Sequence, residues 1–271
     1  VRIPVDAYLT GFSVTLIDAD GKAAPNALIH HLNFIDPENR ELFLPISQRM
    51  LAIGKETGSY SFPKMLFGYP IRLGQPMVVS AMLHNPHVQD YRGVTVRVAF
   101  SYTPTKRPFP LFRVYPFQLD VLFPHGDKSF DLPPGRSERS FEATPVIDGR
   151  IIAVSGHVHE HAEALSLTDV ASGRVLWSGS PTLDSAGNVA RMPVTSFAAN
   201  LGLPLKAGRN YRVTVVYNNP GADTIRAGGM GVVGGVFLPN LLARWPKADP
   251  NDETYVIDRA HYLQQQTRVS R

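Results

Sequence analysis

The stretch Gly74-Gln-Pro-Met-Val-Val-Ser-Ala-Met-Leu-His-Asn-Pro86 has a second, altered copy late in the chain. Without a gap it aligns with Gly208-Arg-Asn-Tyr-Arg-Val-Thr-Val-Val-Tyr-Asn-Asn-Pro220. Each copy has a glycine turn, an apolar run typical of a strand, and an Asn-Pro exit. Because each copy lies late in its own half of the chain, the match predicts two similar β domains in tandem.

Short apolar runs between turns fill the rest of the chain as well. The 23 Pro and 22 Gly are spread along all 271 residues. Many short strands at regular intervals are typical of β-sandwiches and jelly rolls, so we predict an all-β fold of two jelly-roll-type sandwiches. One segment, Asp252–Thr267, has helical composition. Examples of the runs predicted as strands are Tyr8–Ile17, Met77–Leu83, Val94–Tyr102, Phe117–Phe123, Ile151–Val158, Ala164–Leu167, Arg174–Trp177, Tyr211–Tyr217 and Gly231–Leu238.

A polar, proline-rich stretch at residues 131–140 indicates a border between the two domains. We therefore predict an N-terminal β-sandwich domain over residues 1–138 and a C-terminal β-sandwich domain over 139–245. A short extension over 246–271 follows, and its aromatic residues favour docking on a partner or on the chain's own surface.

Composition excludes several classes of site. There is no Cys, so disulfides and thiolate metal sites are excluded, and His, Met and carboxylates remain as metal-binding side chains. The formal charge of +4 is scattered, which argues against nucleic acid and suits an acidic protein partner or lipid headgroups. The chain contains no run of about 18 apolar residues, so no transmembrane segment is predicted within it. We expect an exported protein, periplasmic or extracellular, or one anchored to a membrane through a segment before Val1.

Three of the nine histidines alternate at 157, 159 and 161. Alternation is the period of a strand, so all three are expected on one face, with the Cα atoms of His157 and His159 about 6.6 Å apart. Met230, between glycines, could add a thioether from another strand. Two imidazoles and a thioether suit copper, Cu(I) above all, and leave a coordination position open. The alternative is a wet polar face without a metal.

A second candidate lies in the first half, at His30 and His31. Neighbouring residues of a strand point to opposite faces, so both can reach one ion only at a bulge or a strong twist. Met82 and His84 lie two residues apart on the repeated strand and share a face. Either these groups hold a first-domain copper, or the histidines are buried and bonded to backbone carbonyls.

The order of these motifs resembles that of a known family. They are the His-His pair, the His near an Asn-Pro exit, the His-x-His motif and the later Met. It is that of the copper type II ascorbate-dependent monooxygenases, which includes the peptidylglycine α-hydroxylating and dopamine β-monooxygenases. The resemblance spans about residues 6–240 and implies two jelly-roll domains. It also implies one copper on His30, His31 and a third ligand, and an oxygen-binding copper on His157, His159 and Met230.

The chain departs from this family at two informative positions. Met82 stands where the family has a third histidine, and Ser155 stands where peptide-amidating members have an Arg that binds the substrate carboxylate. The family's disulfides are missing too, since the chain has no Cys. We therefore favour a non-catalytic accessory or structural subunit of a larger, membrane-associated assembly, with one copper or two. The alternative is an ascorbate-type monooxygenase that hydroxylates a small organic substrate; no catalytic residue is assigned.

Overall fold

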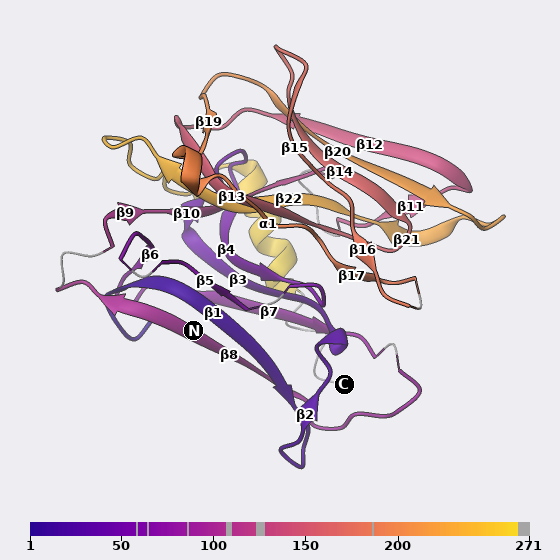
Figure 1. Ribbon diagram of the computed structural model, residues 1–271. Coiled ribbons are helices and arrows are strands. Elements are labelled where there is room, and N and C mark those ends of the chain that lie inside the picture. The colour runs from indigo at the N-terminus through magenta and orange to yellow at the C-terminus, as the bar shows by residue number, and fades with distance from the viewer. Residues whose placement is uncertain are drawn as a thin grey trace. The chain divides into compact units, whose positions relative to one another are not determined.

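A computed structural model describes residues 1–57, 59–63, 65–85, 87–106, 110–122, 128–185 and 187–264 (Figure 1). Strands make up 54% of the chain and helices 7%, so the predicted all-β sandwich class is confirmed. The structure divides into two compact units, each described by itself. The first comprises residues 1–35 and 50–115, and the second comprises residues 36–49 and the described residues from 116 onward.

The first unit is built around a long antiparallel pair, β1 with β8. Ten partner pairs join them, from Ala7 opposite Pro104 to Ile17 opposite Thr95. The other edge of β1 pairs with β6, β5 and β2 in turn, and a separate sheet has the order β4-β3-β7. The elements are β1 (Ala7–Ile17), β2 (Ala23–Ala24), η1 (Asn26–Leu28), β5 (Tyr60–Ser61), β6 (Phe67–Ile71), β7 (Val78–Leu83), β8 (Thr95–Pro104) and β9 (Phe112–Arg113). Three further strands run from one unit into the other: β3 (Ile29–Arg40), β4 (Ser47–Ile53) and β10 (Tyr115–Asp120).

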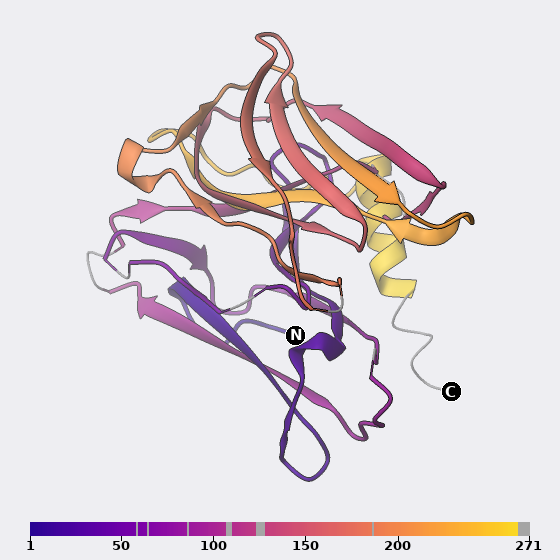
Figure 2. The ribbon, with the colours of Figure 1, turned by 45° about the vertical axis from the view of Figure 1, so that its right-hand side comes forward.

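The second unit is a sandwich of two main sheets, ordered β12-β20-β14-β15 and β10-β22-β13-β18, with β19 also on β13. Figures 1 and 2 show these sheets as two layers. Their inner faces are in close contact, because a Cβ at Gly156 of β13 would lie 2.2 Å from the Leu165 side chain of β14. The elements are β11 (Phe130–Leu132), β12 (Gly135–Ala143), β13 (Gly149–Val158), β14 (Ala162–Asp169), β15 (Arg174–Gly179), β16 (Thr182–Leu183), β17 (Val189–Arg191), β18 (Thr195–Ser196), η2 (Ala198–Asn200), β19 (Leu203–Leu205), β20 (Tyr211–Asn219), β21 (Ile225–Gly229), β22 (Gly231–Pro239) and α1 (Glu253–Gln264).

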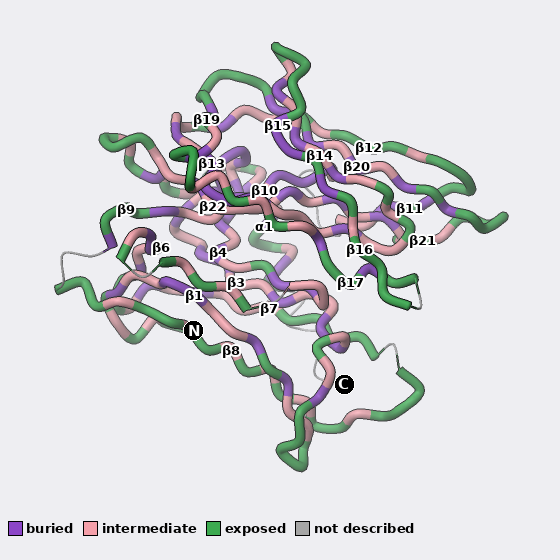
Figure 3. Tube along the Cα trace, viewed as in Figure 1, coloured by how far each residue is buried: buried purple, intermediate pink, exposed green. Residues whose placement is uncertain are grey.

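Alternation of side chains creates the core of this sandwich. Along β20, Tyr211, Val213, Val215 and Tyr217 are buried while the residues between them face outward (Figure 3). This period of two is what a half-buried strand requires, and it is the pattern from which the strand was predicted. The repeated turns agree as well: Gly74 and Gly208 have φ values of 78° and 77°, a conformation that favours glycine.

The C-terminal extension docks on the chain's own second unit as far as residue 264. The predicted helix is present as α1, and its Asp258 carboxylate forms a buried ion pair with Arg49. The Tyr262 hydroxyl lies 3.1 Å from Ser47 Oγ, and the Tyr255 hydroxyl donates to the Pro37 carbonyl. Residues 265–267, the end of the predicted helix, and residues 268–271, the rest of the extension, lie outside the described residues.

The predicted strands are found, but the predicted border is not a linker. Residues 135–143 form β12, which pairs with β20 over nine residue pairs. The stretch is polar because β12 is an exposed edge strand, and charged residues are common on such edges. The boundary predicted between residues 138 and 139 falls inside this strand, whereas the compact units divide near residue 115. Pro86 and Phe123, which end a predicted turn and a predicted strand, lie outside the described residues.

No helix among the described residues is long and apolar enough to cross a membrane.

Candidate metal-binding sites

His157 and His159 lie at the end of β13 with their rings close together. The ring centroids are 5.3 Å apart and the rings are nearly perpendicular, at 87°. A metal about 2.0 Å from one nitrogen of each ring lies about 3 Å from each centroid. Two imidazoles at a tetrahedral angle on one metal therefore have centroids roughly 5 Å apart. The observed separation fits two ligands of a single ion.

His161 does not share this face, so the prediction of three aligned histidines is wrong. Strand β13 ends at Val158, and the chain turns at Glu160 and His161. His161 is exposed, has a φ of 71°, and accepts a hydrogen bond from Asn218 N at its carbonyl oxygen. A residue in the left-handed conformation breaks the alternation of a strand, and the third imidazole leaves the face.

Met230 and His159 lie just beyond the paired ends of two strands. In the antiparallel pair of β13 and β22, His157 lies opposite Val232 and Val158 opposite Gly231. His159 follows Val158 and Met230 precedes Gly231, so both lie next to this last pair. The three groups predicted to form one site are therefore local neighbours within the second unit.

A single hydroxyl, that of Tyr217 on β20, ties the two halves of this site together. It accepts hydrogen bonds from His159 N at 3.0 Å and from Met230 N at 2.9 Å, and it donates to the Met230 carbonyl. Burial raises the pKa of Tyr217 to about 12, and the hydrogen bonds from Met230 and His159 act in the opposite direction. The phenol therefore stays protonated near neutral pH and keeps its donor role.

Sequence reasoning missed Tyr217. It lies on the repeated strand and was expected only as a strand residue, because an apolar run that ends in Tyr carries no sign of a bonded phenol. Its partners come from the start of β22 and the end of β13, so its role depends on strand order and register.

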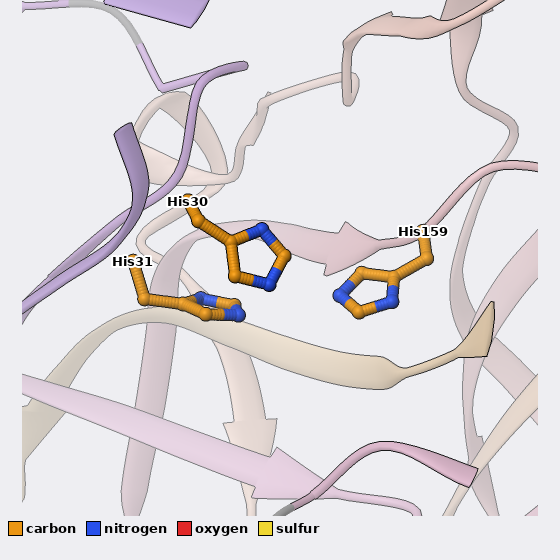
Figure 4. A group of neighbouring side chains, drawn as sticks. All are labelled: His30, His31 and His159. Atoms are coloured by element: carbon orange, nitrogen blue, oxygen red, sulfur yellow. The ribbon is translucent and has the colours of Figure 1, made fainter. Parts of the chain in front are cut away.

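In the first unit, a bulge places His30 and His31 side by side. The register of β3 with β7 shifts between Ile29, opposite Leu83, and His31, opposite Met82, so His30 is the extra residue. The two ring centroids are 4.2 Å apart, and Figure 4 shows both rings projecting from β3 in the same direction. By the same geometry, this separation corresponds to roughly a right angle at a shared metal. The bulge is the irregularity that the adjacent histidines were expected to need. Figure 4 also draws His159, which belongs to the second unit.

Met82 and His84 both border this pair. Met82 lies directly opposite His31 in the register, and the ring of His84 is 6.4 Å from that of His30. Two rings on one metal can be about 6 Å apart only when they lie on opposite sides of it. Met82 is thus the better placed of the two third ligands. Beside His84 is a pocket of about 320 Å³ lined by Leu28, Leu83, His84, Asn85, Tyr91 and Val94.

Comparison with known proteins gives no family. No family model matches the chain, and no curated protein matches it. Among similar solved structures is the major capsid protein P2 from bacteriophage PM2, with 10% identity over 90% of this chain and 93% of that one, and a TM-score of 0.39. PNGF-II has 12% identity over 90% of this chain and 59% of that one, with a TM-score of 0.42. The VP2 subviral particle of infectious bursal disease virus has 10% identity over 90% and 61%, with a TM-score of 0.29. We draw no functional argument from likenesses this low.

Proposed function

We propose that the second unit binds copper, as Cu(I), through His157, His159 and Met230. The observation that carries this is the Tyr217 hydroxyl, which bonds to the backbones of His159 and Met230 at once. It fixes two proposed ligands from two strands against each other before any ion arrives. Preorganised ligands of this kind are what a metal site needs from its surroundings.

The donor set supports copper over other metals. Two imidazoles and a thioether are soft to borderline ligands, which suit Cu(I), whereas magnesium and calcium take oxygen ligands. Three protein ligands leave one position open for exchange with water, a small molecule or a partner's ligand.

For the whole chain, we propose an exported, non-catalytic accessory or structural subunit of a larger, membrane-associated assembly. Ser155 supports this role, because it lies on β13 two residues before His157 and offers no cation to a substrate carboxylate. Met82 supports it as well, since it stands where the copper monooxygenases that the sequence resembles have a histidine. A subunit that only holds copper does not need a second site tuned for electron transfer.

A second candidate function is an ascorbate-type copper monooxygenase acting on a small organic substrate. The bulge at His30 favours it, because two imidazoles and the Met82 thioether gather on the first unit as well. In that case, copper held by the first unit would supply an electron and copper held by the second would activate oxygen. The chain's own contribution would be to position both ligand sets, and the pocket beside His84 would offer an apolar surface.

The test is anaerobic Cu(I) titration against a chromophoric chelator. His159→Ala should lower the affinity of the second site by at least about 100-fold, because losing a ligand should cost no less than losing a group that orients one. His161→Ala is the matched control: it removes an exposed imidazole of the same motif and should leave the affinity unchanged. Met230→Leu should remove the Cu–S contribution from the X-ray absorption spectrum.

Two outcomes would count against these proposals. Equal Cu(I) affinity in wild type and His159→Ala would remove the second-unit site. Ascorbate-dependent oxygen uptake that is lost in both His30→Ala and His159→Ala would replace the accessory role by the monooxygenase. No uptake by the copper-loaded chain with a range of small organic substrates supports the accessory role.

A further inference from the structure

The turn that follows β22 presents two leucines almost entirely to solvent. Ala243 N donates to the Asn240 carbonyl at 2.8 Å, which closes a four-residue turn with Leu241 and Leu242 at its centre. These side chains are 95% and 93% exposed. Nothing in the turn itself uses their apolar surface.

Both ends of this turn are held firmly. Asn240 N donates to the Asp148 carbonyl at the start of β13, and Trp245, only 8% exposed, donates from Nε1 to the Arg40 carbonyl. The two leucines therefore belong to a turn whose backbone is anchored on both sides. They are projected from an anchored base at a fixed place in the sandwich.

Leucine is an unusual choice at such a position. Turn centres favour Gly, Asn, Asp, Ser and Pro, each for a backbone reason, and solvent-exposed turns gain nothing from apolar side chains. The turn between β16 and β17 follows that rule. Asp184 accepts a hydrogen bond from Asn188 N, and Gly187 has a φ of 83°. Two adjacent exposed leucines indicate an apolar contact that the chain makes with something else.

A third leucine lies at the same end of the second unit. Leu201, just after η2, is 76% exposed and has a φ of 56°, so an apolar side chain occupies a strained backbone position in solvent. Figures 1 and 2 both show the η2–β19 segment and the turn after β22 at one end of the unit. We call Leu201, Leu241 and Leu242 the leucine tip.

Positive charge lies beside the leucine tip. Arg244 is exposed on the chain that leaves the turn, whereas the Lys247 ammonium further on donates to Asn39 Oδ1 at 2.9 Å. Arg150 donates from Nε to the Leu201 carbonyl, which fixes its guanidinium beside that leucine. Asp148, whose carbonyl holds the base of the turn, has its carboxylate paired with Lys206 at 3.1 Å. The charge pattern complements an anionic surface.

We propose that the leucine tip inserts into the interface of a bilayer that contains anionic lipids. A projecting apolar turn with Arg244 and Arg150 beside it matches the amphipathic boundary of such a bilayer, where apolar groups enter the acyl region and cations meet headgroups. The same convex shape would need a matching pocket on a protein partner. This proposal does not depend on copper, so each can fail without the other.

The experiment is vesicle co-sedimentation of the full chain with phosphatidylcholine alone and with added phosphatidylserine. The wild type should bind the mixed vesicles more strongly, with binding that weakens as salt rises. Leu241→Ser combined with Leu242→Ser should weaken binding by about tenfold or more, because the apolar contribution scales with buried area. Val175→Ser combined with Leu183→Ser is the control: these side chains are 57% and 56% exposed on other strands and should not matter.

Three results would overturn the proposal. The first is wild-type protein that binds neither kind of vesicle. The second is a double leucine variant that binds the mixed vesicles as strongly as the wild type. A concentration-dependent dimer that the double leucine variant abolishes, without vesicle binding, would assign the leucine tip to a second copy of the chain. Because both substituted leucines are exposed, circular dichroism and Cu(I) affinity should be the same in every variant.

Discussion

Replacing Tyr217 by Phe removes one hydroxyl that serves three backbone groups. His159 N and Met230 N lose their acceptor, and the Met230 carbonyl loses its donor. Tyr217 is 1% exposed, so the ring stays packed in the sandwich while the polar groups around its tip lose their partner. A buried backbone group left unsatisfied costs about 1–3 kcal/mol, and entry of water at the end of β13 recovers part of it. We expect the free energy of unfolding to fall by about 2–4 kcal/mol.

The same substitution should weaken the proposed copper site without removing a ligand. His159 and Met230 would no longer be fixed against each other, and loss of a group that orients metal ligands typically costs 10–100-fold in affinity. Anaerobic Cu(I) competition measures this directly. The Cu–S contribution in X-ray absorption should also weaken or broaden, because it is the position of Met230 that becomes less defined.

Tyr211→Phe is the matched control on the same strand. The Tyr211 hydroxyl accepts a hydrogen bond from Lys206 N at 2.9 Å, and the residue is 2% exposed. Its loss should cost about 1–2 kcal/mol of stability and leave Cu(I) affinity unchanged. If Tyr217→Phe and Tyr211→Phe bind Cu(I) equally well, the hydroxyl of Tyr217 does not organise a metal site, and its role is limited to stability.

Two further predictions concern buried charge in the second unit. Burial raises the pKa of Glu41 to about 7 from 4.5, against hydrogen bonds from Arg49 N and Gln118 N, so its stabilising contribution is complete below pH 4.5 and is lost as pH rises through 7. In urea unfolding, wild type should therefore lose about 2–3 kcal/mol relative to Glu41→Gln between pH 5 and pH 8; a difference that does not change with pH would refute this. Asp258→Ala leaves Arg49 buried and unpaired and should cost about 3–5 kcal/mol. Faster hydrogen exchange in α1 should accompany that loss, whereas Arg259→Ala at an exposed position of the same helix should leave both stability and exchange in α1 unchanged.

Strands whose side chains alternate between core and solvent could be predicted from the sequence. β20 has this pattern and lies where its apolar run placed it. β13 was found from its apolar run alone, because the consecutive residues Ile151–Val154 are all buried and do not alternate. Strand β12 was missed because its sequence, rich in Arg, Ser and Glu, is that of a solvated edge rather than of a half-buried surface. The bounds of strands β3 and β4 were not predicted, for a different reason. Each passes from one compact unit into the other, so its buried face changes along its length and no single period holds.

For the candidate site, the two-residue spacing predicted that His157 and His159 are neighbours. It did not predict the hydrogen bonds of Tyr217 that hold the site in place. His157 and His159 lie close together because two residues is the period of a strand, and β13 ends only one residue before His159. His161 was misplaced because the same period was extended past the end of the strand, where a positive φ ends it. Nothing local in the sequence marks Val158 as the last strand residue. Whether a polar residue continues a strand or begins a turn depends on the partner strands.

Both candidate sites lie where regular pairing is interrupted, and this has a physical reason. A regular strand offers one side chain per face every two residues, so its ligands are at least about 6.6 Å apart at Cα. The extra residue at His30 gives adjacent imidazoles a common direction, and the break between β21 and β22 lets Met230 N and O both turn to the Tyr217 hydroxyl. Regular pairing would use those two backbone groups in a ladder and leave none for the phenol. The irregularities therefore free the backbone to position side chains, and a variant that restores regular pairing at either point should lose metal affinity while gaining stability.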